Sequence, residues 1–171
     1  LALLTFTAPD GLGFLSKSTL TAGVVDHDSA GGAGSAANIV NYYVGATLNT
    51  PLEALKVGAA YDYAGISAVA GAGSAYGNAT SLYLSYAVTE KIKINTRAEY
   101  ASGTSGTSLG GALGFAPFAS GGAGGKAAGA NNSEFLSLVG TVDYALWANV
   151  VSRAEIRWDS DVSGAGTQPF G

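Results

Sequence analysis

The chain of 171 residues contains no cysteine and no methionine, and only 12% of its residues are charged. The absence of cysteine excludes disulfide bonds and thiolate metal sites. No run of about 18 apolar residues occurs, so the sequence predicts no membrane-spanning helix. Basic residues are also few: the net charge of −4, with no basic cluster, argues against a nucleic-acid partner.

Apolar and small residues are abundant instead. Hydrophobic residues make up 47% of the chain, 26 residues are glycine, and the mean hydropathy is +0.25. No capped segment of about ten residues has the 3.6-residue apolar period of a surface helix. The chain is therefore expected to form strands, and if it meets a bilayer, strands must cross it.

Two segments alternate between mostly ionic and mostly apolar residues. Lys, Asn, Arg and Glu take every second position from Ile92 to Tyr100, and the same pattern returns from Val150 to Asp159. Side chains of a strand point alternately to its two faces. Each segment therefore predicts a strand with one ionic face and one apolar face.

Eight segments are rich in β-branched and aromatic residues and are bounded by turn-forming residues. The expected strands are Leu1 to Thr7, Ser16 to Val25, Asn38 to Leu48, Leu55 to Tyr63, Thr80 to Val88, Lys91 to Ala101, Glu134 to Tyr144 and Asn149 to Asp159.

The connections between these strands are expected to alternate between short and long. Short ones lie around Asn49 to Pro51, Thr89 to Glu90 and Leu146 to Ala148, and long ones at Asp26 to Ala37, Ala64 to Ala79 and Ser102 to Ser133. Outer-membrane barrels have short periplasmic turns and long external loops. The pattern predicts an all-β fold: an antiparallel up-and-down meander of about eight strands that forms part of a transmembrane β-barrel.

The ionic face is the candidate functional surface, because a closed barrel with that face inward would enclose an aqueous channel. The charges would either set the electric field of the lumen or pair across strands as a lattice that braces the barrel. Both interpretations stay open here. The candidate pore-lining residues are Lys56, Asp62, Lys93, Arg97, Glu99, Asp143, Arg153, Glu155, Arg157 and Asp159, and Lys17 is expected on the same face.

Aromatic residues on the apolar face cluster near strand ends, while smaller residues such as Ile94 and Leu138 occupy the middles. This distribution is typical of a lipid-facing band between two aromatic girdles. The expected membrane-interface aromatics are Tyr61, Tyr63, Tyr86, Tyr100, Tyr144 and Trp158.

A secreted or surface β-sandwich that serves adhesion or binding is the main alternative, because its outer faces would also carry charge. A barrel that anchors at the cell surface without conducting is a third interpretation. Neither alternative, nor the porin, requires a catalytic residue or a cofactor.

Several short motifs resemble the OmpL-like β-barrel porins, a group of bacterial outer-membrane proteins. They are the run from Ser152 to Asp159, Thr89-Glu90-Lys91 leading into Arg97-Ala98-Glu99-Tyr100, and Ala8-Pro9 followed by Gly13-Phe14. The resemblance spans most of the chain. It implies an outer-membrane channel for passive diffusion of small solutes and ions, in contact with membrane lipid, without catalysis, and often assembled as a homotrimer.

Compared with that family, the chain starts inside a strand, without a signal peptide, and ends at Gly171 without a closing aromatic strand. We therefore expect residues 1–171 to be a single segment of a larger barrel.

His27 stands between Asp26 and Asp28, but three adjacent loop residues rarely converge on a metal, so no metal site is predicted. Phe115, Pro117 and Phe118 interrupt the longest loop and would either constrict the lumen or pack loops together at the barrel mouth.

Overall fold

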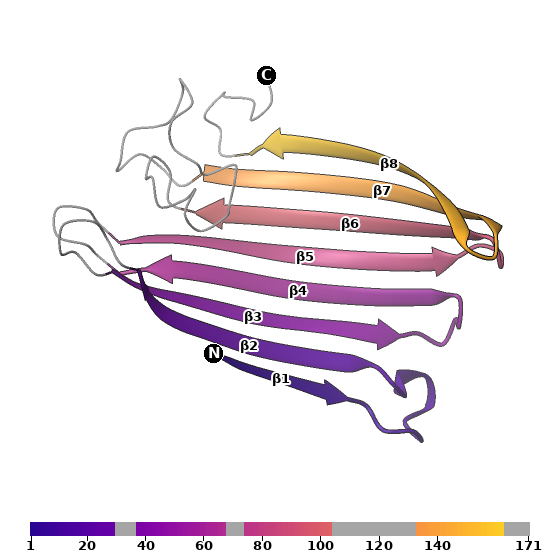
Figure 1. Cartoon of the computed structure of the whole chain (residues 1–171), viewed down its shortest axis with the longest axis horizontal. Helices are drawn as coiled ribbons and strands as arrows, with labels where there is room; N and C mark the ends of the chain where they lie inside the picture. The colour runs from indigo at the N-terminus through magenta and orange to yellow at the C-terminus, as the bar shows by residue number, and fades with distance from the viewer. Residues whose placement is uncertain (30–36, 68–73, 104–132, 163–171) are drawn as a thin grey trace.

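The computed structural model describes residues 1–29, 37–67, 74–103 and 133–162. They form eight strands and one short 3-10 helix (Figure 1). The elements are β1 (Ala2–Thr7), η1 (Gly13–Leu15), β2 (Thr19–Ser29), β3 (Ala37–Asn49), β4 (Leu55–Ile66), β5 (Ala75–Ala87), β6 (Ile92–Gly103), β7 (Ser133–Trp147) and β8 (Val150–Asp161).

All eight strands belong to one sheet, in the order β1 to β8, and each is antiparallel to its neighbour in the chain. The predicted all-β, up-and-down meander is confirmed. Within the described residues the sheet is open, with β1 and β8 as its two edges, and no second sheet is packed against it. That arrangement is consistent with part of a barrel and lacks the two facing layers of a sandwich.

The described part of the chain holds no helix with the length and hydropathy needed to cross a bilayer. Its one helical element, η1, has three residues.

Several strands are longer than predicted. β2 continues to Ser29 and β5 begins at Ala75, so parts of two expected long loops are strand. The reason is that a sheet is joined through backbone groups, which polar residues such as those of 26–29 and small residues such as most of those in 75–79 can supply as well as any others. Three connections lie at the end of the sheet where these long loops were expected: 30–36, 67–74 and 104–132.

The predicted strict alternation of connection size is wrong at the β1–β2 connection. This segment, 8–18, contains η1 and is longer than the connections 50–54, 88–91 and 148–149 at the same end of the sheet. Lys17 lies within it, with a φ of 63°, rather than on a strand face as predicted. We call this end the short-turn end, on the right in Figure 1, and the opposite one the long-loop end.

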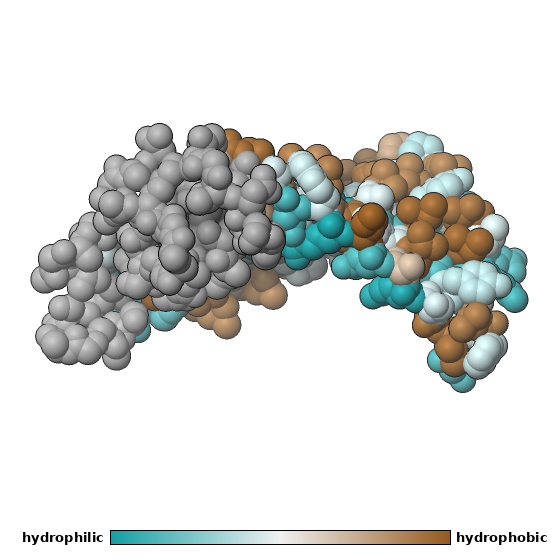
Figure 2. Space-filling view, turned by 90° about the horizontal axis from the view of Figure 1, so that it is seen from above, coloured by the Kyte–Doolittle hydropathy of each residue, from teal (hydrophilic) through white to brown (hydrophobic). Residues whose placement is uncertain are grey.

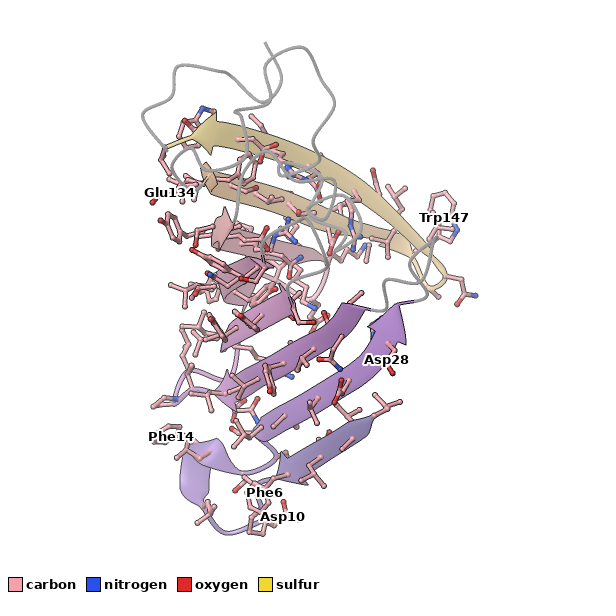
Figure 3. The ribbon with its side chains drawn as sticks, turned by 90° about the vertical axis from the view of Figure 1, so that its left-hand side faces the viewer. Phe6, Asp10, Phe14, Asp28, Glu134 and Trp147 are labelled. Atoms are coloured by element: carbon pink, nitrogen blue, oxygen red, sulfur yellow. The ribbon has the colours of Figure 1, made fainter. Side chains whose placement is uncertain are left out.

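The sheet is a single bent and twisted layer with side chains on both surfaces (Figure 3). Buried side chains lie mainly on the face that carries Arg97, and most of them are small: Ala60, Ala79 and Ala101 are each under a tenth exposed, and Ile39 and Phe135 are the larger exceptions. Large apolar side chains of the opposite face are exposed. Figure 2 shows broad apolar patches, in brown, open at the surface of the described strands.

Candidate functional site

The strand register places all ten candidate pore-lining residues on one face of the sheet, which we call the charged face. Lys93 stands opposite Asp143, which stands opposite Arg153, so three neighbouring strands present ionic groups side by side. Tyr83 and Arg97 are likewise cross-strand partners. The alternation in the sequence assigned charged residues to a face of each strand separately. The register shows which of these residues are neighbours across strands.

Arg153 and Asp143 form the shortest ion pair of this face. The Arg153 Nε lies 2.6 Å from Asp143 Oδ1, and Asn95 donates a hydrogen bond of 3.0 Å to Asp143 Oδ2. The Arg153 side chain is 64% exposed, so water screens much of the attraction. Asp143 therefore ties β6, β7 and β8 together on one side of the sheet.

Two further arginines pair along their own strands. The Arg157 Nε lies 2.7 Å from Asp159 Oδ2, and the Arg97 Nη1 lies 4.0 Å from Glu99 Oε2. Ser81 donates a hydrogen bond of 2.9 Å to the same Glu99 oxygen. These contacts hold both carboxylates on the long-loop side of their arginines.

Two hollows open on the charged face. One, of about 280 Å³, lies among Tyr83, Asn95, Arg97, Glu155 and Arg157, and Thr141 donates a hydrogen bond of 3.1 Å to Glu155 there. The other, of about 560 Å³, lies nearer the long-loop end, and Tyr43, Asp62 and Glu99 are among its lining residues. The smaller hollow is lined mainly by polar and charged groups, whereas the larger one also has aliphatic residues such as Leu3 and Val25 in its lining.

Sequence reasoning missed Tyr43 and Tyr83 on this face. Both rings are more than a third exposed, and both belong to strands with few charges. Their positions relative to Asp62 and Arg97 follow from the register alone. That they share the polar face could have been predicted, because Tyr43 is two residues from Asn41 and Tyr83 is two residues from Ser85 on the same strands.

The six predicted membrane-interface aromatics all lie on the opposite face, which we call the apolar face. The prediction omitted Tyr42 and Tyr76, because Tyr76 fell in an expected loop and Tyr42 precedes a tyrosine of the other face. The ring centroids of Tyr42 and Tyr63 are 6.1 Å apart, and Tyr76 stacks on Tyr63 at 6.3 Å. Three neighbouring strands thus share one aromatic cluster near the long-loop end.

Strand β5 carries a tyrosine near each end of its apolar face, Tyr76 and Tyr86. Ten residues separate them, which corresponds to about 33 Å along a strand. For strands tilted by the ~40° usual in membrane barrels, that is about 25 Å across the bilayer, the height of the apolar band of such barrels. The spacing fits a strand that reaches both membrane interfaces.

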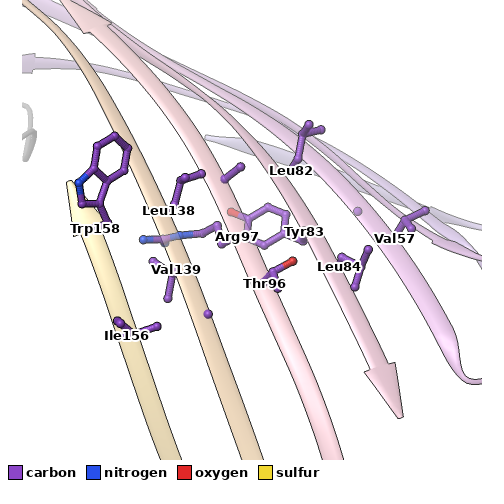
Figure 4. A pocket seen from close by; sticks show the side chains of 13 residues that line it. Val57, Leu82, Tyr83, Leu84, Thr96, Arg97, Leu138, Val139, Ile156 and Trp158 are labelled. Carbon is purple, nitrogen blue, oxygen red and sulfur yellow. The ribbon is translucent and has the colours of Figure 1, made fainter. Parts of the chain in front are cut away.

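The remainder of the apolar face is continuous and apolar. A shallow hollow of about 680 Å³ crosses it from β4 to β8, with Val57, Leu82, Leu138, Ile156 and Trp158 among its lining residues (Figure 4). Ile156 is 77% exposed. The described charged residues that share this face, Asp26, Asp28 and Glu134, lie beyond the tyrosines, at the long-loop end.

Two other features of the sequence, His27 and the apolar residues of the longest loop, do not add to either face as functional residues. His27 is part of β2 and is directed to the face opposite Asp26 and Asp28, because strand neighbours alternate. Across the described residues no three His, Cys, Asp or Glu side chains come together as metal ligands. Phe115, Pro117 and Phe118 lie outside the residues that the structure describes.

Comparison with known proteins links this architecture to one family. The family model described as "Putative beta-barrel porin-2, OmpL-like" matches residues 4–171. Searches of the curated proteins and of the solved structures found no match. The match covers nearly the whole chain and agrees with the resemblance of its strand motifs, and the chain belongs to this OmpL-like β-barrel porin family.

Proposed function

We propose that the protein is a bacterial outer-membrane porin, a water-filled channel for passive diffusion of small solutes and ions. One observation carries the proposal: a single sheet presents its ionic groups on one face and exposed large apolar groups on the other. Lipid on the apolar face and water on the charged face satisfy both surfaces at once. Membership of the porin family supports the same assignment.

Closure into a barrel follows from the two open edges. Unpaired strand edges cannot be left in hydrocarbon, where no water can bond their backbone groups. The edges β1 and β8 must therefore pair with further strands or with each other. In either case the charged face becomes the lumen wall, with the long-loop end outside the cell and the short-turn end in the periplasm.

Transport in this proposal depends on pore width and lumen charge rather than on a reaction. The ten charged residues line the wall, and Tyr43 and Tyr83 add aromatic surface to it. The ion pairs brace neighbouring strands while their outward groups remain in contact with water. In this proposal the charges set the electric field of the lumen and brace the barrel at the same time.

Conductance in a planar bilayer tests the proposal. The purified protein in detergent, added to one chamber, should produce discrete current steps that scale with salt concentration. A heat-denatured sample is the control. A barrel that only anchors would give heat-modifiable migration on gels but no current steps, and a sandwich would remain soluble without detergent.

A further inference from the structure

Three alternate strands of the charged face share one charge order. On β4, β6 and β8 the charged residue nearest the short-turn end is basic, and an acidic residue follows six positions later, toward the long-loop end. Six residues of strand span about 20 Å. The three pairs are Lys56 and Asp62, Lys93 and Glu99, and Arg153 and Asp159.

The register aligns these pairs into two rows. Lys93 and Arg153 flank Asp143, and Lys56 stands opposite Ser85, whose other partner is Asn95. We call Lys56, Lys93 and Arg153 the basic row. Glu99 and Asp159 flank Ser137, and Asp62 stands opposite Ala79, one alternate position further toward the long-loop end. We call Asp62, Glu99 and Asp159 the acidic row.

The other charges of this face follow the order, with two exceptions. Arg97 and Arg157 lie between the rows, and each pairs with the acidic-row carboxylate two residues further along its own strand. Both ion pairs point the same way, positive end toward the short turns. The exceptions are Asp143, which lies within the basic row, and Glu155, which lies two residues beyond Arg153. Both carboxylates offset part of the positive charge near the basic row.

We propose that the lumen is a bipolar channel, with a cation-collecting acidic row near its outer mouth and an anion-collecting basic row toward the periplasm. This inference rests on the proposed function. When the long-loop side is positive, cations enter through the acidic row and anions through the basic row, so both accumulate in the pore. When the long-loop side is negative, both cations and anions are depleted from the pore. The current is then smaller, because fewer ions carry it.

Current measured at equal and opposite voltages tests the inference. In 0.1 M KCl, where charges act over ~10 Å, we expect a current larger by a factor on the order of two when the long-loop side is positive. In 1 M KCl, where that range falls to ~3 Å, the ratio should approach one. The orientation of the protein in the bilayer is determined with a biotin-acceptor tag in the 104–132 connection. Streptavidin added to one chamber binds the tag only if the long-loop end faces that chamber.

Neutral variants separate the two rows. Asp62→Asn/Glu99→Gln/Asp159→Asn should abolish the asymmetry and shift the reversal potential in a salt gradient toward anion selectivity. Lys56→Gln/Lys93→Gln/Arg153→Gln should shift it toward cations. Matched controls are Glu134→Gln, an acidic residue at the same end but on the apolar face, and Lys91→Gln, a basic residue in the β5–β6 turn.

Loss of ion pairs could prevent a triple variant from folding, so a second variant is needed. Lys56→Asp/Asp62→Lys exchanges the two ends of β4, and within the described residues neither side chain has an ion pair closer than 4 Å. It should reduce the asymmetry. Discrete pores with equal currents at both polarities in 0.1 M KCl would overturn the bipolar channel but leave the porin, whereas absence of any current steps would overturn both.

Discussion

Two tyrosines of neighbouring strands lie over glycines two residues further along the chain, one pair on each face. A Cβ placed on Gly45 would overlap the Tyr43 hydroxyl, and one on Gly65 would meet the Tyr63 hydroxyl at 2.9 Å. The glycines therefore let a large ring lie flat on the sheet instead of standing away from it. On the charged face this keeps the Tyr43 ring close to the wall.

Gly45→Ala should consequently push the Tyr43 ring out of its position. Because the overlapping atoms are the far end of a side chain that is 39% exposed, the ring can turn aside, and we expect a loss of stability of about 0.5–1.5 kcal/mol, the cost of an off-rotamer side chain. Urea unfolding in detergent micelles, followed by tryptophan fluorescence, measures the loss. Gly140→Ala is the control, because the nearest atom to its new Cβ would be Ile156 Cγ2 at 3.6 Å, an ordinary contact. Equal stability of the two variants would contradict the packing of Tyr43 over Gly45.

At the scale of a strand, β7 has consecutive residues in opposite environments. Leu138 is on the apolar face and 44% exposed, and Val139 is on the charged face between Arg97 and Arg157. If lipid covers the apolar face, a charge at position 138 enters hydrocarbon. A charge at position 139 enters water next to two arginines.

Leu138→Glu should therefore cost about 2 kcal/mol of stability, in the lower part of the range for lipid-facing charges. Val139→Glu should be close to neutral. Unfolding of both variants in lipid vesicles, compared with the unmodified protein, measures the difference. If Val139→Glu is the more damaging of the two, the charged face is the dry one and the assignment of faces is reversed.

Alternation and turn residues were enough to predict the existence, number and order of the strands. The pairing of charges was not predictable, because it depends on register. Asp143 meets both Asn95 and Arg153 only because β7 lies between β6 and β8 at that offset. The predicted strand ends were wrong where the side chains carry no alternating pattern. Tyr76, for example, follows a run of glycine, alanine and serine, yet its backbone pairs with the neighbouring strand.

At the scale of the molecule, the two tryptophans lie in opposite halves of the sheet. Trp147 ends β7 at the short-turn end, where it projects from the hairpin (Figure 3), and Trp158 lies in the other half of β8. Both side chains are more than half exposed. A bilayer-spanning sheet should place one indole near each interface.

Residues 1–171 contain two tryptophans, so the variants Trp147→Phe and Trp158→Phe each leave one of them in this segment, and their depths can be measured separately. Quenching by lipids brominated at different positions should place both indoles ~10–15 Å from the bilayer midplane. Strongest quenching by the deepest bromine, for either variant, would contradict the aromatic girdles. Absence of quenching by any bromolipid would mean that the apolar face does not contact lipid.

The open edges bear on the size of the barrel. We predict that further strands separate β8 from β1 in the intact protein. Residues 1–171 contain no cysteine of their own, so cysteine pairs introduced there test this prediction: cysteines at Leu4 and at Ala154, Ile156 or Trp158 should form no disulfide within one chain. Cysteines at Val142 and Ala154, which are cross-strand partners, are the positive control. A β1–β8 disulfide in the membrane-bound protein would instead indicate closure at eight strands.

Pairing of every strand with its chain neighbour has a consequence for assembly. The hairpin of β7 and β8 closes over two residues, 148–149, whereas β6 and β7 meet only after 29 residues, 104–132. Closing the longer connection costs roughly 2 kcal/mol more chain entropy. The strands should therefore pair first within two independent units, β1 to β6 and the β7–β8 hairpin. Docking of these two units should be the slow step of folding. Shortening 104–132 should accelerate it.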